Sequence, residues 1–311
     1  MSNLKKRQHY VWRHYLRPWS ENESVWTYLK EQDKVLNTGL MNVAQEKYFY
    51  ELEDFTHEEI SFLKKIVDKS HPSLKALNED FLLIFTSTSI LKIQLAKVSN
   101  PNHKKVLEAK IREVEVNSME EIHSYIENLG SKIIQCRSLK DLKDLDTDDN
   151  LFSAIMFLCV QYFRTKNMRK SIETSFMGEK LEKLAKKSWS FMSFTMATNL
   201  SRNILFDEKL RFIFIENNTT TPFITCDQPV FNILNDKLND NGEVVEMELY
   251  YPLTSKCSFY LHFRPTQIDR FESMIADEDY VTYLNRKVFE NASYYVFSDN
   301  KHVLEQIRRN E

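Results

Sequence analysis

The chain has 311 residues, of which 42% are hydrophobic and 13% aromatic, enough to build a large folded core. Only four glycines are present, which excludes the glycine-rich phosphate loops of Rossmann and P-loop proteins. The formal net charge of −3 lacks the cationic excess of a protein that coats duplex DNA. Basic residues gather only locally, in residues 1–17 and between Gln161 and Lys187. These two runs are either solvated faces or local contacts for an anion.

The first 55 residues are predicted to hold one short helix and at least two strands. A helix-like stretch over 12–19 is ended by Pro18. Residues 25–29 alternate with a period of two, and residues 47–50 are rich in aromatics, so both favour strands.

Residues 56–206 have helical periodicity. Thr56 can cap the first helix together with Glu59, three residues later. The aspartate-rich run over 140–150 is expected to be a solvated loop. Helices are expected over 57–67, 72–93, 102–129, 151–176 and 179–205.

Residues 207–311 return to β-branched and aromatic segments that favour strands. The Asn-Gly at the end of 239–242 suits a hairpin connection, because both residues tolerate a positive φ. A helix over 266–291 and a C-terminal helix complete the chain. Strands are expected over 211–215, 223–225, 244–251, 258–263 and 294–297.

These elements predict an α+β fold. We expect the N-terminal strands of 1–55 to join a mixed or antiparallel sheet formed by 207–311. The large helical region, 56–206, is then an insertion, and the three parts form one compact unit.

The cysteines and the chain ends bear on the compartment. The cysteines form no C-x-x-C pair, which makes a structural zinc site improbable and fits a reducing compartment. We find no signal-peptide pattern and no apolar run of about 18 residues. A cytoplasmic protein without membrane contact is therefore expected. The cysteines are Cys136, Cys159, Cys226 and Cys257.

His9 and Arg13 form the first candidate site. The pattern places His9 just before or at a helix start, where an imidazole tends to stay neutral and can act as a general base or ligand. Arg13, one turn later, could hold a phosphate or carboxylate. The alternative is that His9 caps a turn and Arg13 pairs with an acid.

A second candidate lies where Gln161 interrupts an apolar helix, followed by Arg164, Thr165 and Arg169. A buried amide or guanidinium is destabilising unless its hydrogen bonds are satisfied. A ligand could satisfy them, or a buried structural network could.

The third candidate is Asp227, which follows a strand and precedes Pro229. Acids at strand ends often face clefts. Asp227 could be a metal ligand, a general base or the partner of Arg13 or Arg164. The alternative is an Asx turn that stabilises the bend.

Several short motifs occur in order along nearly the whole chain. They are Gln8-His9-Tyr10-Val11 with Tyr15-Leu16, Gln161 with Arg164 and Thr165, Phe223 to Asp227 with Pro229, Tyr251-Pro252-Leu253-Thr254, and Asn285. Together they resemble the bacterial family called domain of unknown function 4238 (DUF4238). Trp12, Cys226 and Thr254 depart from the family pattern, which has proline, serine and serine there. Proline favours the first helical position, so Trp12 leaves the helix start beside His9 less well defined. The resemblance implies no settled activity, although the family's bacterial and mobile-element setting suggests phage defence or a toxin.

Three functions remain open from the sequence. The first is a nuclease-like enzyme such as an RNase, with or without a single divalent metal. The second is a non-catalytic sensor or binding module that recognises an anionic ligand or, through the helical region, a partner protein. The third is an enzyme that transfers a group onto a nucleotide-like substrate or cleaves such a substrate. In the nuclease hypothesis, His9 transfers protons, and Asp227 orients His9 or binds the metal. The residues that hold RNA or DNA are then Gln8, Arg13, Gln161, Arg164, Arg169 and Asn285.

Overall fold

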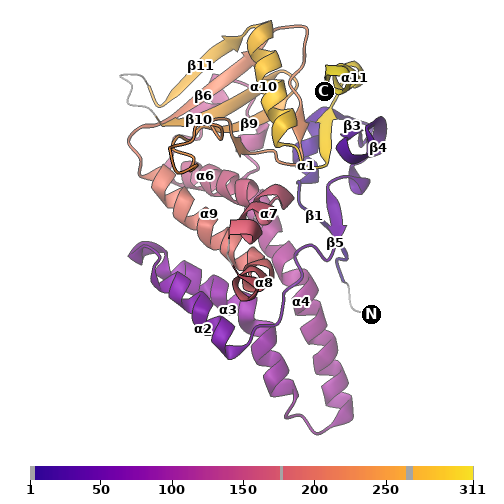
Figure 1. Cartoon of the computed structure of the whole chain (residues 1–311), viewed down its shortest axis with the longest axis vertical. Coiled ribbons are helices and arrows are strands. Elements are labelled where there is room, and N and C mark those ends of the chain that lie inside the picture. The colour runs from indigo at the N-terminus through magenta and orange to yellow at the C-terminus, as the bar shows by residue number, and fades with distance from the viewer. Residues whose placement is uncertain (1–3, 176–177, 264–268, 311) are drawn as a thin grey trace.

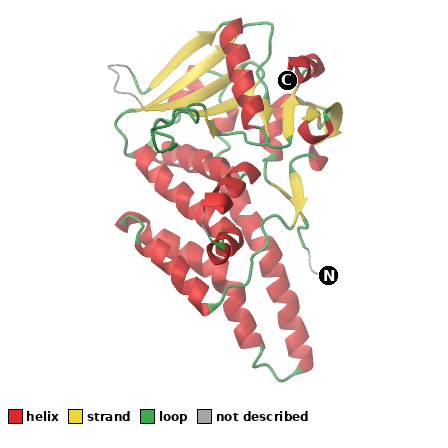
Figure 2. Cartoon of the chain, viewed as in Figure 1, coloured by secondary structure: helices red, strands yellow, loops and turns green. Residues whose placement is uncertain are grey.

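The computed structural model describes residues 4–175, 178–263 and 269–310. The long helices occupy one end of the molecule and the β-sheets the other (Figures 1 and 2). The predicted α+β class is confirmed. None of the described helices is long and apolar enough to cross a membrane.

One five-stranded sheet combines strands from the two ends of the chain. Its order is β2-β3-β12-β7, with β4 paired to the other edge of β3. β12 runs antiparallel to both β3 and β7, so N-terminal strands pair with C-terminal strands as expected. A separate pair, β1 and β5, lies outside this sheet. The bounds are β1 Arg7–His9, β2 Ser20–Glu21, β3 Ser24–Leu29, β4 Lys34–Gly39, β5 Gln45–Lys47, β7 Thr225–Cys226 and β12 Tyr295–Ser298.

The second sheet is built from C-terminal strands only, in the order β11-β6-β10-β9-β8. Its pairs are antiparallel except β11, which runs parallel to β6. α10 follows β11 and α11 follows β12. The bounds are β6 Leu210–Asn217, β8 Phe231–Asn232, β9 Leu249–Thr254, β10 Cys257–Phe263, β11 Phe271–Ala276, α10 Glu278–Asn291 and α11 Lys301–Asn310.

Eight helices among the described residues lie between the N-terminal strands and β6, after the short α1 (Arg13–Leu16). The capping box at Thr56 is confirmed: its hydroxyl accepts the Glu59 N–H, and the Glu59 carboxylate accepts the Thr56 N–H. α3 and α4 form a long hairpin that projects from the rest of the chain (Figure 1). The bounds are α2 His57–Asp68, α3 Pro72–Leu95, α4 Pro101–Leu129, α5 Leu139–Lys143, α6 Asp148–Phe163, α7 Lys166–Ser175, α8 Glu179–Lys187 and α9 Trp189–Leu205.

Several predicted elements are wrong in extent. The strand expected over 47–50 ends at Lys47, because the chain turns at Tyr48, which has a φ of 59°, and buries the next two rings. The loop expected over 140–150 contains α5, because Leu142 and Leu145 are buried. The short helix expected over 12–19 is one α-helical turn followed by a 3₁₀ turn that contains Pro18.

Two long predicted helices are each broken in the structure. The helix expected over 151–176 stops at Phe163, and α7 begins at Lys166, so Arg164 and Thr165 lie at the junction. The helix expected over 179–205 breaks at Ser188. Residue 176 lies outside the described residues.

The helix expected over 266–291 begins only at Glu278. Residues 271–276 form β11 instead, because the buried Phe271 and Ala276 add a strand to the edge of β6. Residues 266–268 lie outside the described part of the chain. Of the strand expected over 244–251, only the part from Leu249 onward belongs to the sheet, as the beginning of β9. The turn at Gly242, with a φ of 77°, is closed by a single bridge between Leu238 and Val244.

Gly130 is required by close packing rather than by its backbone angle. It ends α4 with a φ of −76°, but a Cβ there would overlap the buried ring of Phe157 in α6. We expect Gly130→Ala to lower the free energy of unfolding by about 1–3 kcal/mol, measured by urea denaturation. Gly39→Ala is the matched control, because the nearest atom to a Cβ there is 3.7 Å away. Equal losses in the two variants would contradict this explanation.

Candidate functional site

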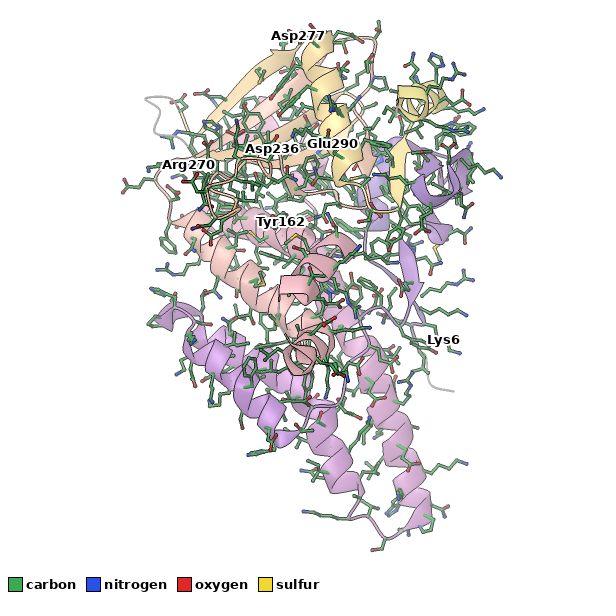
Figure 3. All side chains as sticks on the ribbon, viewed as in Figure 1. Lys6, Tyr162, Asp236, Arg270, Asp277 and Glu290 are labelled. Atoms are coloured by element: carbon green, nitrogen blue, oxygen red, sulfur yellow. The ribbon has the colours of Figure 1, made fainter. Side chains whose placement is uncertain are left out.

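A polar pocket of about 400 Å³ opens between the N-terminal segment and α4. Lys6, labelled in Figure 3, directly precedes Arg7, one of the residues that line this pocket. One wall comes from β1, α1 and Met41, and the other from a single face of α4. The lining residues are Arg7, His9, Trp12, Arg13, His14, Arg17, Met41, Glu120, His123, Ser124 and Glu127.

His9 lies at the end of β1, paired with Gln45 of β5, and α1 begins only at Arg13. Trp12, where the family pattern has proline, is the extended residue before that helix. Burial lowers the pKa of His9 to about 4, and the positive charges of Arg13 and Arg164 act in the same direction. The imidazole is therefore neutral at physiological pH, and the cause is burial at the end of a strand rather than the helix start suggested by the sequence.

The Arg164 side chain connects the two walls of the pocket. It is 1% exposed. One Nη donates to the Glu127 carboxylate over 2.9 Å, and the other donates to the His9 carbonyl oxygen over 2.8 Å. The break between α6 and α7 places this guanidinium where it contacts both walls. His9 and Arg164, distant in sequence, are thus brought together.

The α4 wall was not anticipated from the sequence. Glu120, His123, Ser124 and Glu127 have the spacing i, i+3, i+4 and i+7, which places them on one helical face. Burial raises the pKa of both Glu120 and Glu127, against the opposing effect of Arg164. This spacing is the sequence signal that indicates the α4 wall, but a charged helix face is usually exposed to solvent.

Two buried imidazole nitrogens beside this pocket have no hydrogen-bond partner in the described structure: His9 Nε2 and His123 Nδ1. The ring centroids of Tyr50 and His123 are 4.1 Å apart, and Arg164 Cζ lies 5.8 Å from the Tyr50 centroid. Buried polar groups are nearly always paired with protein, water or a ligand. Water or another polar molecule would satisfy these two nitrogens.

Gln8 and Gln161, the two glutamines proposed to bind substrate, are both buried. The Gln8 amide donates to the Val116 carbonyl over 2.8 Å and accepts the Tyr50 N–H over 2.7 Å, so it fixes β1 against α4. Gln161 Nε2 has no partner among the described residues. Neither glutamine lines the pocket.

Asp227 is not brought to the pocket. Its two carboxylate oxygens accept the N–H groups of Ser293 and Tyr294, each over 2.8 Å, and tie the end of β7 to the start of β12. Burial raises its pKa to about 6. Asp227 therefore forms backbone hydrogen bonds instead of an ion pair with Arg13 or Arg164. It also does not form the alternative Asx turn, because its partners are distant in sequence.

Arg169 and Asn285 also lie elsewhere. Arg169 pairs with Glu173 at 2.8 Å and lines a separate pocket of about 280 Å³. Asn285 donates to the Pro222 carbonyl over 2.8 Å and accepts the Ile224 N–H over 3.0 Å, which fixes α10 beside β7. Among the described residues, no group of three or more His, Cys, Asp or Glu side chains could hold a metal ion.

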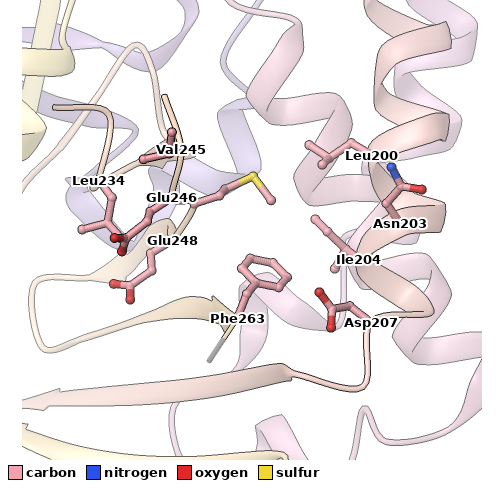
Figure 4. Close-up of a pocket in the computed structure, with 10 residues that line it drawn as sticks. Leu200, Asn203, Ile204, Asp207, Leu234, Val245, Glu246, Glu248 and Phe263 are labelled. Atoms are coloured by element: carbon pink, nitrogen blue, oxygen red, sulfur yellow. The ribbon is translucent and has the colours of Figure 1, made fainter. Parts of the chain in front are cut away.

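Another cavity, of about 300 Å³, lies between the end of α9 and the strands β9 and β10 (Figure 4). Its walls are largely aliphatic, with carboxylates at Asp207, Glu246 and Glu248. Glu248 is paired with His262 at 2.7 Å. Unlike the first pocket, this cavity contains none of the residues that the sequence motifs indicate.

The fold and the first pocket define an α+β protein with an arginine-rimmed polar site between its first strand and α4. The family model described as protein of unknown function (DUF4238) matches residues 7–302, so the chain belongs to the DUF4238 family. The match includes every residue that lines the pocket. No curated protein and no solved structure matches the chain significantly.

Proposed function

We propose that the protein is an RNase that uses acid–base catalysis in the pocket between β1 and α4. The observation that supports this most is the neutral imidazole of His9 in the same pocket as Glu120, a carboxyl group with a raised pKa. Arg7 and Arg13 line the same pocket and suit a polyanion, whereas Arg17 is paired with Glu23. A base, an acid and a phosphate site are the requirements of RNA cleavage.

The reaction can be written with groups of this pocket alone. His9 takes the proton of a ribose 2′-hydroxyl, whose oxygen attacks the adjacent phosphorus. The bond from phosphorus to the 5′-oxygen breaks, and Glu120 donates a proton to that leaving oxygen. The products are a 2′,3′-cyclic phosphate and a 5′-hydroxyl. Arg13 stabilises the negative charge that develops on the phosphorane oxygens.

The roles of the arginines differ from the sequence-based hypothesis. Arg164 is already bonded to Glu127 and to the His9 carbonyl, so we assign it a positioning role. Arg13 and Arg7 line the open pocket and would contact the phosphates. Asp227 and Asn285 serve as structural clamps in this proposal.

The direct test is incubation of the purified protein with end-labelled single-stranded RNA and with DNA of the same sequence, in Mg²⁺ or in EDTA. We expect RNA to be cleaved in both buffers and DNA to remain intact, because DNA lacks the nucleophilic 2′-hydroxyl. A 2′-deoxy substitution at the cleaved position should abolish cleavage there. If RNA binds through Arg13 but stays intact, the nuclease proposal fails and a binding module takes its place.

The pH dependence of cleavage provides a second check. The lowered pKa of His9 means that the base loses its proton-accepting form only near pH 4. We expect a bell-shaped profile of kcat/KM, in which the acidic limb has an apparent pKa near 4 and the basic limb follows the loss of the Glu120 proton. An acidic limb near pH 6.5, the ordinary value for histidine, would contradict the assignment of His9 as the base.

The biological setting is part of the proposal. An RNase with a toxin or phage-defence role would act in the cytoplasm, where its substrate is. All four cysteines are free and buried, which is compatible with a reducing compartment.

A further inference from the structure

α3 has two contrasting faces. One face packs on α9, where Phe81 lies 5.0 Å from Phe194 and Phe85 lies 5.8 Å from Phe191 between ring centroids. The opposite face carries exposed or half-buried apolar side chains at helical spacing. In chain order that outer face consists of Leu77, Asp80, Leu83, Ile84, Ser87, Ile90, Leu91 and Gln94.

The outer face of α3 is more apolar than an ordinary solvated helix face. Leu83 is 61% exposed and Ile90 40% exposed. They stand seven residues apart, as do Leu77, Ile84 and Leu91, so the apolar side chains form a continuous stripe about 20 Å long. A contiguous stripe of this kind marks an interaction surface rather than scattered surface residues.

The charges at the two ends of this stripe are opposite. The exposed Asp80 lies near its N-terminal end, and the exposed Lys97 follows its C-terminal end. The small Ser87 stands midway between them. A face that is acidic at one end, basic at the other and small in the middle is complementary to a copy of itself turned by 180°.

We propose that the protein forms a twofold symmetric dimer in which the outer faces of two α3 helices pack antiparallel. With Ser87 on the twofold axis, Ile84 of one copy faces Ile90 of the other, and Leu83 faces Leu91. Asp80 then lies within one helical turn of Lys97 of the second copy, at both ends of the contact. Ser87 lets the helices approach closely at the centre.

The first test is the mass of the full chain in solution, measured by sedimentation equilibrium over roughly 1–100 µM. We expect a dimer at the upper concentrations and a monomer for Ile90→Glu throughout. The matched control is Ile275→Glu, because Ile275 is 68% exposed on β11, outside α3. A wild-type chain that remains monomeric over the whole range would overturn the proposal.

The second test reports the geometry. A cysteine in place of Ser87 lies on the twofold axis, where antiparallel helices bring the two Cα atoms within disulfide range. Because the native cysteines are all buried, mild oxidation with copper phenanthroline should cross-link Ser87→Cys into dimers. Ser61→Cys on the exposed side of α2 should not cross-link. The opposite result would exclude this antiparallel register.

The third test uses the charges. Asp80→Lys and Lys97→Glu should each weaken dimerisation by about three- to tenfold, because each places like charges together twice. The double swap should restore the wild-type dissociation constant. Additive weakening in the double variant would count against the proposed pairing. RNA cleavage by the monomeric Ile90→Glu variant is measured separately, so dimerisation and catalysis can fail independently.

Discussion

Replacing His9 with alanine is expected to lower kcat for RNA cleavage by about 10²–10⁴-fold, the usual contribution of a general base. The value of KM should change little, because Arg7 and Arg13 would still bind the phosphates. The His9 ring also makes hydrogen bonds to the backbone of Leu40 and Met41, so the loss of activity is interpreted together with the folded fraction of the variant. Single-turnover kinetics on a labelled oligonucleotide measures the loss.

The comparison that makes this result decisive is His302→Ala. His302 is exposed on α11, so its removal should leave both kcat and the unfolding midpoint unchanged. Unchanged cleavage by the His9 variant would remove the proposed base. A loss of cleavage matched by a loss of folded protein, seen by circular dichroism, would assign His9 a structural role only.

The second large effect is on stability. We expect Glu127→Gln to lower the free energy of unfolding by about 3–5 kcal/mol, because it removes the carboxylate that accepts the hydrogen bond of the buried Arg164 and leaves Glu120 as its remaining acidic neighbour. Arginine cannot escape by losing its proton. The double variant Glu127→Gln with Arg164→Met should recover part of the loss, since no buried charge remains. Urea denaturation at pH 7 measures all three chains.

An exposed ion pair provides the control. Arg286 and Glu290 pair at 2.9 Å on the surface of α10, where Arg286 is 74% exposed. Arg286→Gln should change stability by less than about 1 kcal/mol, because it removes only the exposed partner and Glu290 keeps its contact with Lys287. If Glu127→Gln is as mild as this control, then the Arg164–Glu127 pair does not hold β1 against α4.

The helical part of the fold was the most predictable. The cap at Thr56 and the prolines at the first position of α3 and of α4 are local signals, and the structure follows them. The break at Ser188 was not readable, because the helical pattern continues on both sides of it. β11 was mistaken for helix because its strand character depends on pairing with β6, a contact distant in sequence.

The pocket was predictable only in part, because it too depends on contacts between residues that are distant in sequence. His9 and Arg164 stood out individually, but their contact joins residues 155 positions apart. Asp227 also stood out, yet the backbone at Ser293 satisfies it, and no local pattern indicates that partner. The face of α4 that carries Glu120 and Glu127 resembles a solvated surface until β1 covers it.

The sheet that joins both chain ends has a consequence for biosynthesis. Every residue that lines the pocket has left the ribosome well before β12, at Tyr295–Ser298, is made. Until then β3 has only β2 and β4 beside it, and the long-range pairing that completes this sheet is missing. The N-terminal strand β3 therefore reaches its final pairing only when translation is nearly finished, although the residues of the pocket are made much earlier.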